Sequence, residues 1–276
     1  MTRKPTISIR MRSKGVPHGL TLIELLIAVS IIAMTAAALG SLARATQISA
    51  VYVEGHSTAA QHARVTLERM QRAVRTATAS ETFPGIAMFS ENVSGNRYPD
   101  TLVVWKPTEG TAAATPTLLP QFSELVVFCP NPLKPNELLE ITSRNDARTV
   151  PALSNLGQWT SELWSLKTGN ASKKVVLTDM LRTAAPPASP APRGCARYEV
   201  VLRPSASELT SFRSGSATWN SLAWPQHWYS DTTGMRQTWV RMELQLMPHS
   251  RAGGAAIDET AIPFFGSAST FSEIQR

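Results

Sequence analysis

The sequence predicts an α+β fold in which a long N-terminal helix packs on an antiparallel β-sheet head. Three observations predict it. The 276-residue chain has an apolar run at 20–43, no proline between Pro17 and Pro84, and short β-rich segments beyond residue 80. Proline ends or kinks helices, so its absence permits one long helix. The β-rich segments show no strand–helix–strand rhythm, which favours an antiparallel sheet.

The positive charge is concentrated at the N-terminus. The chain has 27 Lys and Arg against 20 Asp and Glu, a formal charge of +7. Residues 1–19 contain no acid and five bases, namely Arg3, Lys4, Arg10, Arg12 and Lys14. Removing them leaves 22 basic against 20 acidic residues, so the rest of the chain is nearly neutral. A net positive charge usually suggests an anionic partner such as nucleic acid or a membrane surface. Here most of that charge belongs to one short segment. The hydrophobic fraction of 43% excludes a wholly disordered chain.

The apolar run 20–43 predicts a membrane-spanning helix. Glu24 is its only charge, and residues 25–43 contain neither charge nor proline. As a helix those residues would be about 28 Å long, close to the ~30 Å hydrocarbon core of a bilayer. A buried core helix is the alternative, but the run is apolar on all sides and follows a basic arm. The positive-inside rule places that arm in the cytoplasm and residues beyond about 45 on the other side.

Three interpretations compete for residues 1–43. An ordinary secretory signal would be cut after its apolar part, within the Ala-rich 34–43. A plain signal anchor would stay uncut. Neither explains Glu24, because a carboxylate at bilayer depth costs on the order of 2–4 kcal/mol and normally has a partner.

The third interpretation accounts for the leader, the apolar run and Glu24 together. Residues 19–26, GLTLIELL, resemble the type III signal of prepilins and pseudopilins, behind a basic leader. In that family a leader peptidase cuts after the Gly and methylates the new amine. The resemblance implies cleavage between Gly19 and Leu20, N-methylation of Leu20, and a role for Glu24 in assembly by pairing with a neighbour's amine or its own. The family often has Phe where this chain has Leu20.

The long helix is expected from Leu20 to about Ala79, roughly 90 Å at full length. Its second half carries one apolar stripe at spacings of four and three, formed by Ala63, Leu67, Met70, Val74 and Ala77. The basic cluster Arg69, Arg72 and Arg75 predicts a solvated helix face rather than a nucleic-acid site, because no aromatic residue interleaves it and Glu68 lies among the arginines. A kink at Gly40-Ser41 stays open.

Residues 80–276 predict a β-rich globular head. The expected strands are Thr101–Lys106, Glu124–Cys129, Glu137–Thr142, Lys174–Thr178, Arg197–Leu202 and Gln237–Leu246. The last alternates best, with Val240, Met242, Leu244 and Leu246 on one face. A short helix is expected at Leu153–Leu166. The Pro/Ala-rich residues 183–193 predict a surface loop of one head domain, with a linker between two domains as the alternative.

Nothing in the sequence predicts catalysis, a metal or a cofactor. It lacks an HExxH pair, a GxSxG, a Walker loop and a GxGxxG. Cys129 and Cys195 are the only cysteines, and in an oxidising compartment they would form a disulfide. That bond could contribute roughly 4 kcal/mol in the chain-entropy model. Two buried free thiols are the alternative.

The resemblance implies a structural subunit rather than an enzyme: a minor pilin or pseudopilin of a type II secretion system or type IV pilus. Residues 64–77, RVTLERMQRAVRTA, are loosely similar to J-type minor pseudopilins and W-type minor pilins, which implies the initiating or tip complex. The implied partners are the prepilin peptidase, other pilins or pseudopilins, the inner-membrane assembly platform and the lipid bilayer, with no specific nucleic acid.

The implied location is the inner membrane, with a single pass, a cytoplasmic leader, and a periplasmic or otherwise extracytoplasmic head that enters a filament. The alternative is a membrane-anchored enzyme, adhesin or DNA-binding head delivered by the same route. A head charge near +2 disfavours strong DNA binding.

Overall fold

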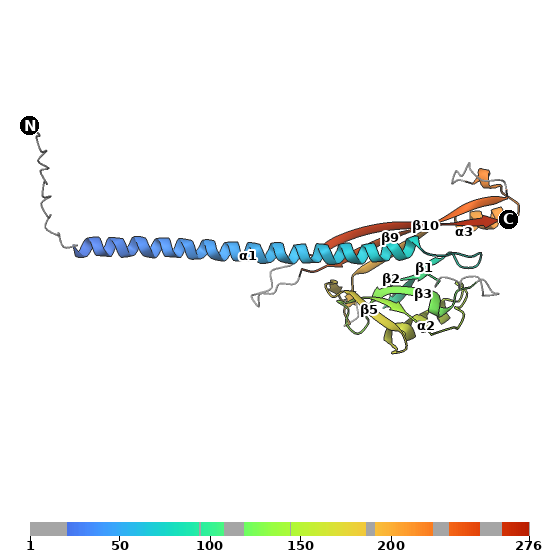
Figure 1. Cartoon of the computed structure of the whole chain (residues 1–276), viewed down its shortest axis with the longest axis horizontal. Helices are drawn as coiled ribbons and strands as arrows, with labels where there is room; N and C mark the ends of the chain where they lie inside the picture. Colours follow the sequence, from blue (N-terminus) through green and yellow to red (C-terminus); the bar gives the residue numbers. More distant parts are fainter. Residues whose placement is uncertain are drawn as a thin grey trace, which may run out of the picture. The chain divides into compact units, whose positions relative to one another are not determined.

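The computed structural model describes residues 21–93, 95–107, 119–143, 145–185, 191–222, 232–248 and 261–275. The chain divides into two compact units, Met1–Ala50 and Val51–Arg276. Helix α1 (Leu22–Arg75) begins in the first unit and ends in the second, and the second unit contains the antiparallel sheets (Figure 1). The predicted α+β class, with a long N-terminal helix and an antiparallel head, is confirmed.

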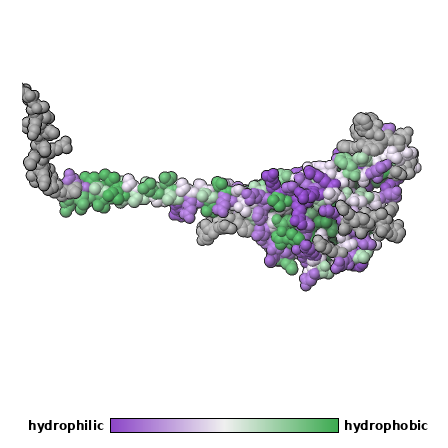
Figure 2. Space-filling model, in the orientation of Figure 1, coloured by the Kyte–Doolittle hydropathy of each residue, from purple (hydrophilic) through white to green (hydrophobic). Residues whose placement is uncertain are grey.

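The first half of α1 exposes its apolar side chains. Every residue from 21 to 50 is exposed, and Leu22, Ile32 and Met34 are each more than 60% accessible. The green stretch of the helix in Figure 2 shows this apolar surface. An 18-residue window of α1 has a mean hydropathy of 2.4, so by length and composition this helix can cross a membrane. The helix continues through Gly40 without interruption.

The second half of α1 buries the predicted stripe. Ala63, Met70 and Val74 are at most 1% exposed and Leu67 is 8% exposed. The helix ends at Arg75, four residues earlier than expected, because the Thr78 N–H bonds the Trp105 carbonyl at 3.0 Å instead of continuing the helix. A contact with the sheet therefore decides where the helix stops.

A five-stranded antiparallel meander forms the larger sheet, in the order β1-β2-β3-β4-β5. Its strands are β1 (Ile86–Val93), β2 (Asn96–Trp105), β3 (Leu125–Pro130), β4 (Leu138–Thr142) and β5 (Lys173–Thr178). Four of them, β2 to β5, overlap strands expected from the sequence, with ends that differ by a few residues. The first, β1, was not expected, because its sequence IAMFSENV ends in polar residues and pairs through a register shift between Phe89 and Glu91.

The smaller sheet has three antiparallel strands in the order β10-β9-β8. They are β8 (Ala196–Arg203), β9 (Thr233–Leu246) and β10 (Ile262–Gln275). The predicted alternation in β9 is confirmed, since Val240, Met242, Leu244 and Leu246 are fully buried. The whole length of β9 pairs with β10, from Leu246 opposite Ile262 to Thr233 opposite Gln275.

The larger sheet separates two cores. On one face, Leu102 of β2 and Phe128 of β3 join the α1 stripe and the buried face of β9. On the other face, Val103 and Val127 join Trp159 of helix α2 (Leu156–Thr168). Successive residues of one strand thus serve opposite cores, as the period of two requires.

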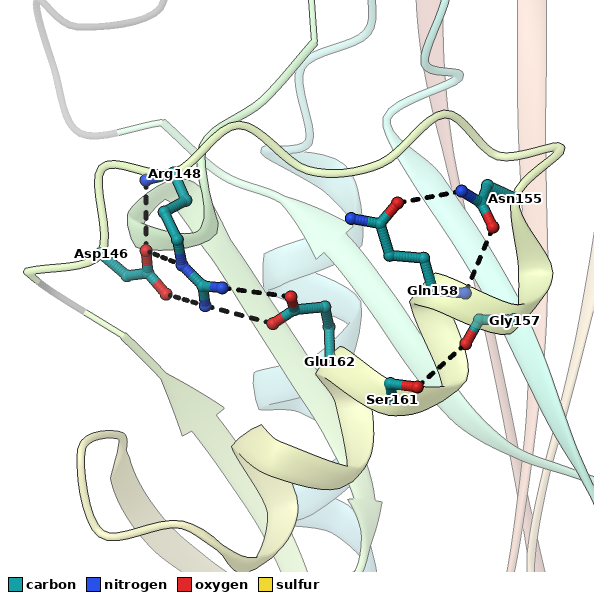
Figure 3. Close-up of polar contacts among 7 residues, drawn as sticks. All are labelled: Asp146, Arg148, Asn155, Gly157, Gln158, Ser161 and Glu162. Carbon is teal, nitrogen blue, oxygen red and sulfur yellow. Dashed lines mark hydrogen bonds and ion pairs between the residues drawn. The ribbon is translucent and has the colours of Figure 1, made fainter.

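Helix α2 is fixed by a cap and an ion triad (Figure 3). The Asn155 side chain accepts a hydrogen bond from the Gln158 N–H at 3.3 Å, which satisfies one free donor of the first turn. Arg148 lies between two carboxylates, with 2.7 Å to Asp146 and 3.1 Å to Glu162 of α2. These contacts fasten the expected helix to the loop that precedes it.

Short elements complete the head. They are the 3-10 turns η1 (Phe122–Glu124) and η2 (Trp219–Ser221), helix α3 (Ala206–Arg213), and the two-residue strands β6 (Thr183–Ala184) and β7 (Arg193–Gly194). The ends of the predicted loop 183–193 therefore pair as β6 and β7, and its centre, 186–190, lies outside the described residues.

Candidate processing and assembly site

The residues that the sequence assigns to processing and assembly lie at the start of α1. Gly19 and Leu20 fall outside the described residues, so the structure gives no geometry for the expected cleavage. Glu24 lies in the first turn of the helix and is exposed. It is preceded by Thr21, the first residue that the structure describes.

Thr21 and Glu24 form a reciprocal cap. The Thr21 N–H and hydroxyl both donate to Oε2 of Glu24 at 2.9 Å, and the Glu24 N–H donates to the Thr21 hydroxyl oxygen at 3.3 Å. A Thr followed three residues later by Glu satisfies two free N–H groups in this way, an arrangement known as a capping box. The negative charge also interacts favourably with the positive end of the helix dipole.

Glu24 keeps one oxygen available. Both hydrogen bonds from Thr21 to its carboxylate use Oε2, and no residue in the described part of the chain bonds Oε1. A carboxylate has about four lone-pair positions, so it can accept further hydrogen bonds. Glu24 can therefore hold the start of the helix and accept a cationic donor at the same time.

Sequence reasoning missed the role of Thr21. The pattern Thr-x-x-Glu before an apolar run is a recognised helix start, and it was present in the TLIE of residues 21–24. It also accounts for the helix beginning at Leu22.

The two cysteines are free thiols in the structure, so the expected disulfide is not formed there. Cys129 is fully buried on β3 in the core beneath α2, and Cys195 is half-buried between β7 and β8. Burial raises the pKa of the Cys129 thiol to about 12. Their segments do approach one another, since a Cβ built on Gly194 would lie 2.9 Å from Cβ of Pro130. The disulfide stays a prediction for experiment.

The basic cluster of α1 is partly engaged with the sheet. Arg69 forms a bidentate ion pair with the Glu140 carboxylate on β4, with 2.9 Å between Nη2 and Oε1. Arg72 pairs with Glu68 at 3.3 Å on the exposed helix surface, at the spacing expected from the sequence. These residues line a groove of about 400 Å³ between α1 and the sheet. Arg69 thus clamps the helix to the head, a contact that sequence spacing could not show.

A second set of charges lies between the β1–β2 hairpin, α2 and β7. Glu91 accepts from Lys167 and from Arg193, each at 2.5 Å, and Arg193 also pairs with Asp100 at 2.7 Å. Lys167 is 4% exposed and donates to the Thr101 hydroxyl at 2.8 Å. Burial by itself raises the pKa of Glu91, but the two cations outweigh it and the pKa is lowered. Each charge here has an opposite partner, so the cluster joins elements together.

Within the described part of the chain, the histidines do not assemble into a metal site. Over the described residues, no group of three or more His, Cys, Asp and Glu side chains could hold a metal ion. The His62 ring lies 3.2 Å from the Thr178 hydroxyl and 4.0 Å from Asp179, and His56 contacts the Tyr52 carbonyl on the same helix.

Comparison with known proteins identifies one match. Residues 17–40 match the family model described as the prokaryotic N-terminal methylation motif. No curated protein and no solved structure matches the chain. The matched segment contains Gly19, Leu20 and Glu24.

The N-terminal segment is therefore a type IV prepilin-like signal. This motif implies processing by a prepilin peptidase and assembly with other pilins, and it is typical of structural subunits. Together with the apolar first half of α1, it is consistent with membrane anchoring.

Proposed function

We propose that the chain is a minor pilin or pseudopilin subunit of a type II secretion system or type IV pilus, placed in the initiating or tip complex. The observation that supports this most directly is Glu24, which lies inside the matched motif and keeps one carboxylate oxygen unoccupied by the described residues. The loose likeness of residues 64–77 to J-type pseudopilins and W-type pilins is the basis for the tip position.

In the proposed pathway the basic leader 1–19 stays in the cytoplasm and is removed between Gly19 and Leu20. Leu20 then carries a methylated, positively charged amine four residues before Glu24. Residues 20–43 anchor the subunit in the inner membrane, the helix extends to Arg75, and residues 80–276 form the extracytoplasmic head. The assembly platform then adds the subunit to a filament with other pilins.

The proposed chemistry of assembly is the pairing of two costly charges. A carboxylate and an amine that are each unpaired in the bilayer both carry a large desolvation cost, and pairing reduces both. Because Thr21 occupies only Oε2, Oε1 of Glu24 is left to accept the amine of a neighbouring subunit or of the same chain.

Two substitutions separate this pairing from helix capping. Glu24→Gln keeps an oxygen that accepts from Thr21 but removes the charge. Thr21→Ala removes the hydroxyl of the cap, a loss of about 1 kcal/mol, but leaves the charge. We expect both variants to be cleaved, and only Glu24→Gln to enter filaments about tenfold less than the wild type. The measurements are the intact mass of membrane-extracted protein and its fraction in sheared filaments.

The outcomes discriminate clearly. Normal incorporation of Glu24→Gln would contradict the charge pairing, and an equal loss in Thr21→Ala would assign Glu24 to capping alone. Gly19→Val should leave the leader attached. A mature chain starting near residue 44 instead of at N-methyl-Leu20 would refute the prepilin route.

The second candidate is an enzyme, adhesin or DNA-binding head delivered by the same route. Hydrolase activity of the detergent-extracted full chain would favour an enzyme. Tight DNA binding that weakens steeply with salt would favour a DNA-binding head, because phosphate contacts release counterions.

A further inference from the structure

Arg236 holds a positive charge inside the head. It lies on the buried face of β9, between the inward-facing Gly234 and Thr238, and is only 7% exposed. An arginine side chain stays charged at any physiological pH. Burying such a charge is costly unless an anion or a set of acceptors compensates it.

The described residues supply no such compensation. The Nε of Arg236 is buried without a hydrogen-bond partner. Among the residues with described positions, no carboxylate oxygen lies within 4.0 Å of Arg236 or of Arg213. Burial lowers the pKa of Arg236, and the like charge of Arg213 lowers it further. A second cation is thus close enough to act on the first.

Three segments surround Arg236. The Trp219 ring covers Gly234, since a Cβ built there would lie 2.2 Å from the indole. On the other side the Thr238 hydroxyl donates to the Pro84 carbonyl at 3.2 Å. Arg213 lies at the end of α3, and both of its terminal nitrogens are 3.4 Å from the Glu81 carbonyl oxygen.

Among the described residues, two buried donors at this end of the head have no acceptor. The Trp219 indole N–H is buried without a partner, like the Nε of Arg236. More than nine in ten buried polar groups in native proteins are paired, so two unpaired donors beside a second guanidinium indicate a missing acceptor. Guanidinium groups recognise carboxylates, phosphates and sulfates through parallel N–H bonds.

We propose that Arg236 and Arg213 form a binding site for a small oxyanion, such as phosphate, sulfate or a free carboxylate. The ligand is small because Arg236 is almost fully enclosed. It enters from the side of Arg213, whose side chain is exposed. This site is independent of the proposed assembly function, which concerns the other end of the chain's sequence.

The full chain in detergent provides the test. Its melting temperature is measured in phosphate, sulfate and acetate against chloride at equal ionic strength. Phosphate and sulfate stabilise most proteins by exclusion from the surface, so the informative quantity is the response of the wild type minus that of Arg236→Met. We expect this difference to be about 3–6 °C at an anion concentration roughly ten times Kd.

Three further variants support the comparison. Arg213→Gln should weaken the stabilisation by anions. Arg236→Lys should keep the positive charge but lose most of the stabilisation, because an ammonium lacks the planar, two-pronged donor geometry of a guanidinium. Arg97→Met, which removes an exposed arginine of β2, should respond as the wild type. Asp231, five residues before Arg236 in the sequence and outside the described residues, is the internal carboxylate to exclude, and Asp231→Asn should leave the response unchanged.

Two results would overturn the proposal. The first is a wild type and an Arg236→Met variant with equal responses to every anion. The second is a response that the wild type lacks and that appears in Asp231→Asn, because Asp231 would then fill the site itself.

Discussion

Replacing Lys167 by Met tests whether the charges between β1, α2 and β7 stabilise the head. Lys167 is 4% exposed and bonds Glu91 at 2.5 Å and the Thr101 hydroxyl at 2.8 Å. Methionine fills a similar volume but leaves Glu91 without one of its two cations. Removing one partner of a buried pair typically costs 3–5 kcal/mol.

Two contacts that remain in the variant place the expected loss at the lower end of that range. Glu91 keeps its contact with Arg193 at 2.5 Å, and its side chain is 26% exposed, so water compensates part of the loss. The Thr101 hydroxyl still donates to Asp100 at 3.0 Å. We therefore expect a loss of about 3 kcal/mol in the free energy of unfolding, which lowers Tm by about 6–12 °C in a head of this size.

The pH dependence has a definite sign. The folded-state pKa of Glu91 is lowered, so its contribution is complete above the pKa of the unfolded chain, about 4.3, and is lost as the pH falls through the folded value. The difference between the wild type and Lys167→Met should therefore be largest near pH 7 and shrink below about pH 4.

Urea unfolding of the detergent-solubilised chain at pH 7 and pH 3.5 measures both effects. Lys106→Met, which removes an exposed lysine, serves as the control and should change stability by less than about 0.5 kcal/mol. A loss below about 1 kcal/mol in Lys167→Met at pH 7, or a loss that does not depend on pH, would refute the reasoning.

Two further predictions concern packing and thiol reactivity. Gly234→Ala should destabilise the head by about 1–3 kcal/mol, because its Cβ would lie 2.2 Å from the Trp219 ring, whereas Gly157→Ala in α2 meets nothing within 4 Å and should raise stability by about 0.5–1 kcal/mol. Chemical unfolding compares the pair, and equal effects would contradict the packing. At pH 8 Cys195 should react with a maleimide before Cys129, whose thiol is buried with a pKa of about 12. Mass spectrometry after labelling shows which cysteine reacts first. A chain in which no thiol reacts until a reductant is added would instead have formed the disulfide.

Local patterns were sufficient for the helix and for one strand. The apolar stripe from Ala63 to Val74 repeats with the period of a helix, and Val240–Leu246 alternates with the period of a strand, so each pattern shows which face is buried. The GLTLIELL signal was equally local, since the matched motif occupies one short segment. The Thr-x-x-Glu pattern of the capping box at Thr21 and Glu24 is equally local.

Other features depended on partners distant in the sequence. Strand β10 has the sequence IPFFGSASTFSEIQ, whose Gly, Ser and Ala predict a strand poorly, and it forms because β9 pairs with all of it. The end of α1 was decided by the Trp105 carbonyl, which takes the Thr78 N–H from the helix.

The charged contacts show the same division. Lys167 and Arg193 reach Glu91 across 76 and 102 residues, and the like charge of Arg213 acts on Arg236 from another element. Periodicity and motif spacing give information only about residues that are close together in the sequence. The sequence by itself therefore determined the prepilin-like signal, the long apolar helix and the class of fold. The pairing of charges, the strand β10 and the burial of Arg236 were decided only when folding brought distant side chains together.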